Sequence, residues 1–300
     1  MPKIIILAIL SIISIGQAKP QEKLKSGGVI PVMSWGGIPQ TEVSVESYRK
    51  LKDVGVNIDI AFFTSADAIA SAIDAAGKAG VKLMISCPEL RSDPERTAQR
   101  FKKHPALEGY YLADEPASPQ FQELADWAKR LKAVDDKHYS FVNLFPNINS
   151  NQGKFGTKDY QEYIDTFDNL FPAPYLSFDF YPLVDGTVHP RWYENMEFFG
   201  NKYKTGGRPF WAFALTTSYL AYSDDSGQPT LNDFYQLYKT YKPEKTFLHD
   251  IPTLAGLRLQ TYVNLAYGAQ GIEYWSFRGF GSPLDAQGKR TVVYDRLQEV

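Results

Sequence analysis

Apolar runs of strand length alternate with amphipathic segments of helix length from residue 28 to the end of the chain. The runs are almost continuously apolar, which is typical of parallel strands that are covered on both faces. Strands that alternate with helices favour a parallel sheet with helical crossovers. The eight runs that predict strands are Val29–Ser34, Ile58–Thr64, Val81–Cys87, Gly109–Ala113, Tyr139–Leu144, Leu176–Tyr181, Pro209–Leu215 and Ile272–Phe277.

Between these runs, apolar residues recur at the three- and four-residue spacing of one helix face. Residues 121–131 and 160–171 show this spacing, and Ser118 with Pro119 predicts an N-cap and a first-turn proline for the first of these helices. Eight strand–helix units in about 270 residues are the size of one closed α/β domain, the (β/α)₈ or TIM barrel. An open doubly wound sheet is the alternative, but no glycine-rich phosphate loop follows the first strand.

Two features interrupt the regular alternation. A polar, tyrosine-rich insertion at residues 219–250 follows the seventh predicted strand. Because the active sites of barrels form where the strands end and the loops begin, we expect the insertion at that face. The last helix begins near Val292 and has only about nine residues, which is short for a barrel helix. We therefore expect the natural chain to continue past Val300.

The first 18 residues predict a cleavable signal peptide. Lys3 precedes an apolar stretch, Ile4–Ile15, and small residues follow at Gly16 and Ala18. This stretch of about 12 residues is short for a bilayer span and typical of a secretory signal, with a retained anchor as the alternative. Residues 19–27 are expected to form a flexible leader. We expect a secreted or periplasmic protein with no integral membrane span after removal of the signal.

Composition narrows the function only a little. A net charge of -2 gives no electrostatic argument for a nucleic-acid partner. The 19 Tyr, 19 Phe and 5 Trp indicate either a heavily packed core or a cleft lined with flat faces for sugar rings. The single cysteine, Cys87, cannot form an internal disulfide and is expected to be buried. The sequence has no motif for a metal or a cofactor.

Polar and aromatic residues gather at the predicted strand ends. They comprise carboxylates, indoles, amides and hydroxyls without a cationic cluster, whereas a phosphorylated substrate would need Arg, Lys or a glycine nest. Sugars need flat apolar faces and neutral or anionic hydrogen-bonding groups, so this ring predicts a polyol site. Its members are Trp35, Gly36, Gly37, Thr64, Ser65, Pro88, Glu89, Asp114, Glu115, Pro116, Asn143, Asn147, Asp179, Tyr181, Thr216, Thr217 and Trp275.

Glu115 is the main catalytic candidate. It follows Asp114 directly after the strand Gly109–Ala113. Two ionisable residues at the end of a buried strand are costly to desolvate unless they are paired or used. A carboxylic acid that this environment keeps protonated is the general acid that glycosidic cleavage needs. The alternative is that the pair caps the next helix or bridges to Arg or Lys, and for Asp114 the two interpretations stay open.

The segment Tyr111–Pro116 resembles the Asn-Glu-Pro signature at the fourth strand of clan A glycoside hydrolases, with Asp in place of Asn. Residues 257–275, which include Gly-Ala-Gln-Gly-Ile and Tyr-Trp, resemble the seventh helix and eighth strand of β-galactosidase-like members. The resemblance extends over residues 28–300 as a pattern of strands and strand-end residues. It implies a TIM barrel with glycosidase activity, in which Glu115 is the acid/base and Trp275 a platform under the sugar.

The seventh strand departs from the clan A pattern, because Phe210–Thr217 has no carboxylate where those enzymes have a nucleophilic Glu. Another carboxylate serves, the enzyme inverts, or the barrel binds sugar without cutting it. Asp179, at the end of the sixth strand, is the best substitute. Its distance from Glu115 decides its role, and strands two apart favour the larger gap of inverting enzymes, roughly 6.5–9.5 Å. The alternative for Asp179 is a substrate-hydroxyl acceptor or a structural bond.

The remaining candidates are expected to bind substrate. They are Trp35, Asp114, Asn143, Tyr181 and Trp275, and for Asn143 a turn-forming role is the alternative. The sequence therefore predicts a glycoside hydrolase that cleaves O-glycosidic bonds of an extracytoplasmic oligosaccharide or polysaccharide. A non-catalytic carbohydrate-binding barrel is the first alternative, and a hydrolase of another bond is the second.

Overall fold

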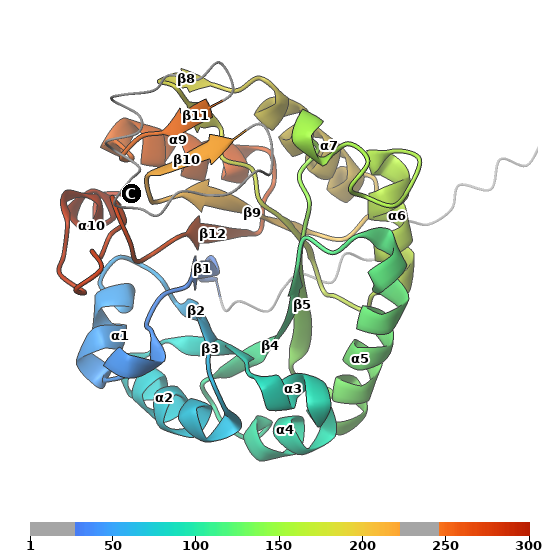
Figure 1. Cartoon of the computed structure of the whole chain (residues 1–300), viewed down its shortest axis with the longest axis vertical. Helices are drawn as coiled ribbons and strands as arrows, with labels where there is room; N and C mark the ends of the chain where they lie inside the picture. Colours follow the sequence, from blue (N-terminus) through green and yellow to red (C-terminus); the bar gives the residue numbers. More distant parts are fainter. Residues whose placement is uncertain (1–27, 223–245) are drawn as a thin grey trace, which may run out of the picture.

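Eight parallel strands close into a barrel in this computed structural model, which describes residues 28–222 and 246–300 (Figure 1). The order around the barrel is β1-β12-β9-β6-β5-β4-β3-β2. Each strand overlaps one of the eight apolar runs, so the predicted (β/α)₈ fold is confirmed. The strands are β1 (Val32–Trp35), β2 (Ile58–Phe62), β3 (Lys82–Ser86), β4 (Leu107–Asp114), β5 (Tyr139–Leu144), β6 (Leu176–Phe178), β9 (Phe210–Leu215) and β12 (Gly271–Trp275). The predicted signal peptide and leader lie outside the described residues.

Helices surround the barrel as an outer ring (Figure 1). None of those in the described ranges is long and apolar enough to cross a membrane. They are α1 (Val45–Lys52), α2 (Ala66–Ala79), α3 (Pro88–Ser92), α4 (Pro94–Phe101), α5 (Phe121–Val134), α6 (Tyr160–Leu170), α7 (Arg191–Lys204), α9 (Leu254–Ala266) and α10 (Val292–Leu297). Three short 3₁₀ turns, η1 (Gln40–Glu42), η2 (Ser118–Gln120) and η3 (Asn149–Asn151), lie in the loops.

The start of α5 differs from the prediction. Ser118 does not cap this helix but begins η2, and its hydroxyl donates to the carbonyl oxygen of Gly156 at 2.8 Å. The side chain of Gln120 accepts from the backbone N–H of Ala117 at 2.9 Å. The Ser118 hydroxyl, which the sequence predicts as the cap of α5, thus binds the loop that follows β5. This hydrogen bond connects the loop after β4 to the loop after β5.

The core has two parts, one inside the barrel and one between the sheet and the helices. Alternate strand residues point inward, and there Trp211 stacks on Tyr175 with ring centroids 3.9 Å apart. Burying a large apolar side chain stabilises the fold by about 1.5–3 kcal/mol. The inner part therefore gives the mouth of the barrel a rigid floor. It consists of Met33, Ile58, Ile60, Met84, Tyr111, Phe141, Tyr175 and Trp211.

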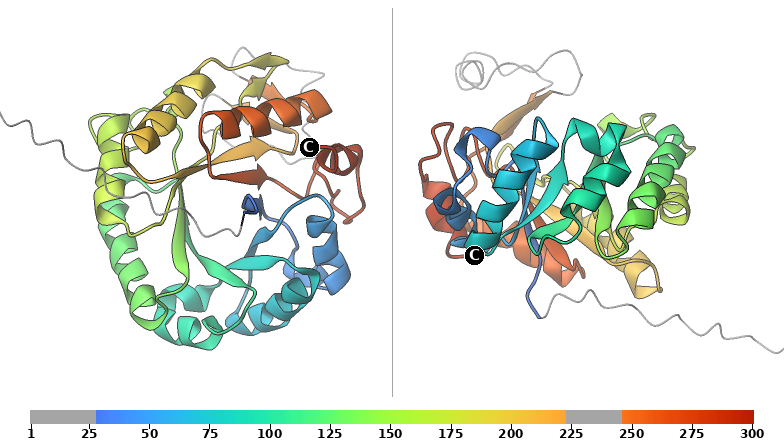
Figure 2. Two further views of the ribbon diagram at one scale, coloured as in Figure 1. Left: turned by 180° about the vertical axis from the view of Figure 1, so that it is seen from behind. Right: turned by 90° about the horizontal axis from the view of Figure 1, so that it is seen from below.

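A hairpin extends the barrel after β9. Strand β10 (Tyr219–Tyr222) pairs antiparallel with β11 (Thr246–His249), so that Tyr219 lies opposite His249. A second short hairpin, β7 (Leu183–Val184) with β8 (Thr187–Val188), follows β6. Both hairpins follow the carboxyl ends of barrel strands, and Figures 1 and 2 show them on the same side of the ring. The remainder of the predicted insertion, residues 223–245, lies outside the described residues.

Candidate active site

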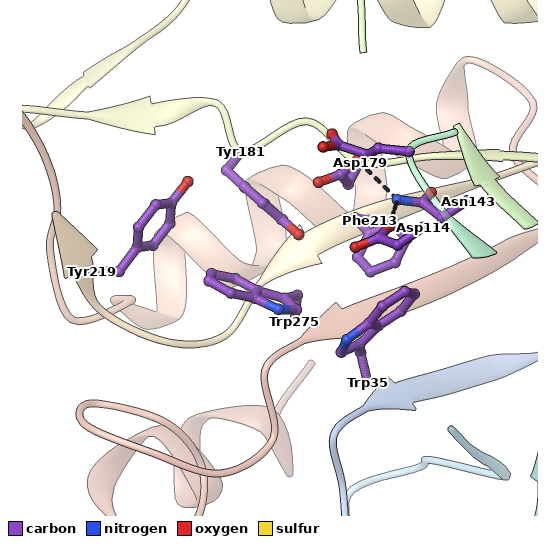
Figure 3. A pocket seen from close by; sticks show the side chains of 9 residues that line it. Trp35, Asp114, Asn143, Asp179, Tyr181, Phe213, Tyr219 and Trp275 are labelled. Carbon is purple, nitrogen blue, oxygen red and sulfur yellow. Dashed lines mark hydrogen bonds between the residues drawn. The ribbon is translucent and has the colours of Figure 1, made fainter. Parts of the chain in front are cut away.

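A cavity of about 360 Å³ opens at the carboxyl ends of the strands (Figure 3). All seven side chains that the sequence singled out for the site line it, together with two that it did not single out, Phe213 and Tyr219. Thr64, Glu89 and Thr216 belong to the predicted ring of strand-end residues but do not line the cavity. The lining residues are Trp35, Asp114, Glu115, Asn143, Asp179, Tyr181, Phe213, Tyr219 and Trp275.

Strand register brings the acidic residues together. Asp114, the last residue of β4, pairs with Asn143 of β5, which in turn pairs with Ser177 of β6. Asp179 follows directly after β6. The pairing of β4 with β5 shifts register between Tyr111 and Ala113, and such a bulge re-aims the side chains that follow it. The carboxyl groups thus come from strands separated by β5 and still enter one cavity.

Glu115 has an unusual backbone conformation. Its φ of 42° lies in the left-handed region, which costs a non-glycine residue about 1–3 kcal/mol. Its N–H donates to the carbonyl oxygen of Asn143 at 2.9 Å, which holds the turn in place. Strain of this kind persists where the surrounding structure fixes it, and here it places the Glu115 carboxyl among the other carboxylates.

Asn143 organises the acidic side of the cavity. Its Nδ2 donates to Asp114 Oδ1 at 3.0 Å and to Asp179 Oδ1 at 2.9 Å, as the dashed lines in Figure 3 show. Its Oδ1 accepts from the Ser177 hydroxyl at 3.0 Å. The turn-forming interpretation of Asn143 is wrong, because the residue is buried within β5. Both hydrogens of its side-chain amide thus donate to carboxylates.

The carboxyl groups of Glu115 and Asp179 line the same cavity, and each affects the pKa of the other. Burial raises the pKa of Glu115, and the negative charges of Asp179 and Asp114 raise it further. Burial and the charge of Asp114 also raise the pKa of Asp179, but less, because the Asn143 amide stabilises its ionised form. Glu115 is therefore expected to keep its proton at a pH at which Asp179 is ionised. The gap of roughly 6.5–9.5 Å between the two carboxyl groups, expected from the sequence, stays a prediction.

Asp114 differs from the other two carboxylates in being exposed to solvent within the cavity. Desolvation by the surrounding protein raises its pKa, and the hydrogen bond from Asn143 opposes that effect. It accepts from Asn143 and contributes negative charge next to Glu115. Asp114 neither caps α5 nor forms an ion pair with Arg or Lys among the ion pairs of the described residues.

Aromatic rings form another wall of the cavity. Trp275 stacks on Tyr181 at 5.2 Å with an interplanar angle of 25°, and Tyr219 meets Trp275 edge-on at 5.0 Å. His249 stacks behind Tyr219 at 4.2 Å. Figure 3 shows the rings of Tyr181, Tyr219 and Trp275 gathered away from Asp114 and Asn143. The β10–β11 hairpin thus supplies part of the site that the barrel strands do not.

The seventh barrel strand, β9, has no carboxylate, but the next strand around the barrel does. Glu273 of β12 lies opposite Phe213 of β9 and is 1% exposed. Its Oε2 lies 2.7 Å from the Ser177 hydroxyl. Glu273 is not among the residues predicted for the site, although a Glu in the middle of an apolar barrel strand is a signal that could have indicated it.

Solved structures share this fold. An endo-α-mannosidase of family GH99 from Bacteroides thetaiotaomicron aligns with a TM-score of 0.53 and 13% identity over 85% of this chain and 76% of its own. Xylanase 10B from Thermotoga petrophila RKU-1 gives 0.52 and 12% over 90% and 93%. A family 5 mannosidase from Rhizomucor miehei gives 0.50 and 10% over 90% and 92%. No family model and no curated protein matches the chain. The class is a (β/α)₈ barrel with the fold of these glycoside hydrolase structures.

Proposed function

We propose that this protein is a glycoside hydrolase in which Glu115 is the general acid and Asp179 the second carboxylate. The observation that carries the proposal is the pair of carboxyl groups that face one cavity walled by aromatic rings. A carboxylic acid that is protonated at neutral pH beside an ionised carboxylate is the pair that glycosidic cleavage needs. Trp35, Tyr181 and Trp275 bind the sugar through their flat faces.

The reaction at this pair is straightforward to balance. As the bond between the anomeric carbon and the glycosidic oxygen breaks, the electron pair stays on the oxygen, which takes the proton of Glu115. The positive charge that develops on the sugar ring lies next to the ionised Asp179. Asp179 then either takes a proton from a water that attacks the anomeric carbon, or attacks that carbon itself. In the second case water hydrolyses the resulting glycosyl ester and returns its proton to Glu115. In either case the seventh-strand Glu of clan A enzymes is replaced by a carboxylate from β6.

Three further points support a carbohydrate substrate. The neighbouring structures are named as two mannosidases and a xylanase, the latter in complex with xylobiose. The cavity of about 360 Å³ combines rings with carboxylates and an amide, which suits an oligosaccharide or polysaccharide end or segment. The resemblance of residues 257–275 to β-galactosidase-like members belongs to this proposal as well.

We infer that the protein acts outside the cytoplasm, because residues 1–18 have the pattern of a secretory signal peptide. The mature chain would then begin near Lys19 and meet glycans in the periplasm or the medium. Expression of the full chain, fractionation of the cells and mass determination of the N-terminus test this. A product that keeps residues 1–18 and stays in the cytoplasm would refute the inference.

The decisive experiment is hydrolysis of a panel of aryl glycosides and polysaccharides by the mature chain. Glu115→Gln and Asp179→Asn should each lower kcat by at least about 10²–10⁴, the usual contribution of an acid or base catalyst. Glu89→Gln is the matched control, because this strand-end carboxylate lies outside the cavity, and it should keep wild-type kcat. The anomer of the first product then distinguishes an attacking Asp179 from one that activates water.

The absence of a carboxylate from β9 favours one other candidate, a barrel that binds carbohydrate without cleaving it. That candidate predicts sugar affinity without turnover on any glycan. Calorimetry with the same panel, performed on wild type and Trp275→Ala, separates the two. Binding that Trp275→Ala removes, with no product from the wild type, would replace the hydrolase by the binding protein.

A further inference from the structure

The Ser177 hydroxyl, beneath the cavity, contacts two buried side chains. Ser177 Oγ lies 3.0 Å from Asn143 Oδ1 and 2.7 Å from Glu273 Oε2, and all three side chains are at most 1% exposed. A serine hydroxyl has a single hydrogen and can donate only once. One of the two contacts must therefore use a hydrogen from the other partner.

The direction of the Asn143 amide decides which contact this is. Its nitrogen faces Asp114 and Asp179, and an amide oxygen in that place would face two carboxylates with no hydrogen between them. The nitrogen therefore stays there, and Oδ1 faces Ser177 as a pure acceptor. The hydroxyl of Ser177 must donate to Asn143. The 2.7 Å contact then needs a hydrogen from Glu273, which has one only as a neutral carboxylic acid.

The surroundings of Glu273 agree with a neutral acid. Burial raises its pKa well above the ordinary value, and the charges of Asp179 and Asp114 add to that effect. Its Oε1 has no hydrogen-bond partner in the described parts of the chain, which costs far less for a carbonyl oxygen than for an ionised one. At the paired positions of the neighbouring strands lie Met33 and Phe213, which offer no charge.

We propose that Glu273 is a positioning residue, which stays protonated and acts through Ser177 to fix the direction of the Asn143 amide group. The chain of donors runs from the Glu273 acid to Ser177, from Ser177 to Asn143, and from Asn143 to Asp114 and Asp179. Its consequence is that both amide hydrogens stabilise ionised carboxylates. Because Asp179 is thereby kept ionised, its charge helps to keep the proton on Glu115, where the proposed function requires it.

Two substitutions of Glu273 separate a neutral donor from a charge. Glu273→Gln is isosteric, cannot ionise and still donates to Ser177, so it should keep the wild-type titration of Asp179 and the wild-type kcat. Glu273→Met fills the same apolar space and donates nothing. Ser177→Ala breaks the chain one residue later and should match Glu273→Met. The double variant Glu273→Met/Ser177→Ala should have the same effect on the Asp179 titration as either single variant, because both substitutions remove the same hydrogen-bond link.

The first measurement is independent of turnover: ¹³C NMR titration of carboxyl-labelled protein, with Glu115→Gln and Asp179→Asn used for assignment. The titratable groups that face Glu273 are Asp179, Asp114, Tyr139 and Tyr175, and only the aspartates ionise below pH 8. Glu273→Met and Ser177→Ala should move the Asp179 titration to higher pH. Glu273→Gln should leave it in place.

The second measurement rests on the proposed function: the pH profile of kcat and KM. Glu273→Met should lower kcat about tenfold, equivalent to 1.4 kcal/mol in the barrier, and move the acid limb to higher pH with KM little changed. If Glu273→Gln damages the enzyme as much as Glu273→Met, an ionised Glu273 is needed and the proposal is wrong. An Asp179 titration that ignores Glu273→Met also overturns it. Absence of turnover in the wild type would refute the hydrolase alone, because the NMR titrations would still respond.

Discussion

The carboxyl groups of Glu115 and Asp179 line the same cavity although β4 and β6, the strands that precede them, are not neighbours in the barrel. The strand between them, β5, contributes Asn143. Its side-chain amide donates to Asp179, and its backbone carbonyl oxygen accepts from the backbone N–H of Glu115. One residue thus fixes the positions of both. Because the charge of Asp179 raises the pKa of Glu115, the ionisation of one carboxyl group affects that of the other.

The pair predicts a bell-shaped pH profile of kcat/KM. Burial, with the charges of neighbouring carboxylates, raises the pKa of Asp179 to about 6 and that of Glu115 to about 9. Below the lower limb Asp179 gains a proton and loses its charge. Above the upper limb Glu115 loses the proton that the leaving group needs. Initial rates at subsaturating substrate from pH 4 to pH 10 measure both limbs.

The residual activity of Asp179→Asn tests whether the charge of Asp179 sets the position of the upper limb. Removing the negative charge beside Glu115 should move the upper limb to lower pH, because the charge of Asp179 is one cause of the raised pKa of Glu115. Glu89→Gln should leave both limbs unchanged. An upper limb that stays in place in Asp179→Asn would contradict the coupling of the two residues.

Glu115→Gln should stabilise the protein while it abolishes activity. The folded state raises the pKa of Glu115 above its ordinary value of 4.5, so ionisation in the unfolded state makes unfolding more favourable as the pH rises. The amide avoids this loss, and it also avoids repulsion from Asp179. We expect Tm at pH 7–8 to rise by about 2–4 °C, which is about 1 kcal/mol for a domain of this size.

The difference in Tm between Glu115→Gln and wild type should depend on pH. Below about pH 4 the carboxyl is protonated in both states, so Glu115→Gln and wild type should unfold at similar temperatures. The difference should grow as the pH rises toward 9. Thermal unfolding followed by circular dichroism at a series of pH values measures it. A difference that is constant with pH would indicate a packing effect instead.

Sequence patterns predicted the barrel and most of the site because both depend on local rules. Apolar runs locate strands, and residues after those runs lie at the mouth, which is how Glu115, Asp179 and Trp275 were found. The hydrogen-bond network depends on register between strands, which single runs do not encode. The register shift in β4 between Tyr111 and Ala113, just before Asp114 and Glu115, could not be predicted for the same reason.

The residues that the sequence missed have different reasons. Phe213 points into the cavity from an apolar strand in which every residue looks like core. Tyr219 was one of many tyrosines in an insertion, and only the pairing of β10 with β11 places it against Trp275. Glu273 lies in the middle of the apolar strand β12 and not at its end, and its proposed role depends on counting the hydrogens of Ser177.

Gly37→Ala should destabilise the loop that follows Trp35. A Cβ at Gly37 would lie 2.1 Å from Asp59 Oδ1, an atom that also accepts the Ser34 hydroxyl at 2.7 Å. Asp59 is fully buried and cannot move aside without losing these bonds. We expect a loss of about 3 kcal/mol from overpacking and broken hydrogen bonds. Urea unfolding measures it.

Gly36→Ala is the matched control for this substitution. Gly36 has a φ of +62°, but no atom lies within 4 Å of a Cβ built there, so the variant has backbone strain without a clash. That strain costs roughly 1–2 kcal/mol. Equal losses at the two positions would mean that the buried Asp59 yields and that the contact is not rigid.

Trp275 and Tyr219 should contribute to sugar affinity to different degrees. Trp275 comes from a barrel strand, stacks on Tyr181 and presents the larger face, so Trp275→Ala should raise KM or Kd tenfold or more, about 1.4 kcal/mol. Tyr219→Ala should have a smaller effect of the same kind, whereas Tyr219→Phe keeps the ring and should be close to wild type. Tyr262→Ala, an exposed position on α9, is the control for removing an aromatic ring elsewhere. Calorimetry on the Glu115→Gln background measures affinity without turnover. If Tyr219→Ala binds sugar like wild type, the β10–β11 hairpin does not belong to the substrate site, and the barrel strands alone form it.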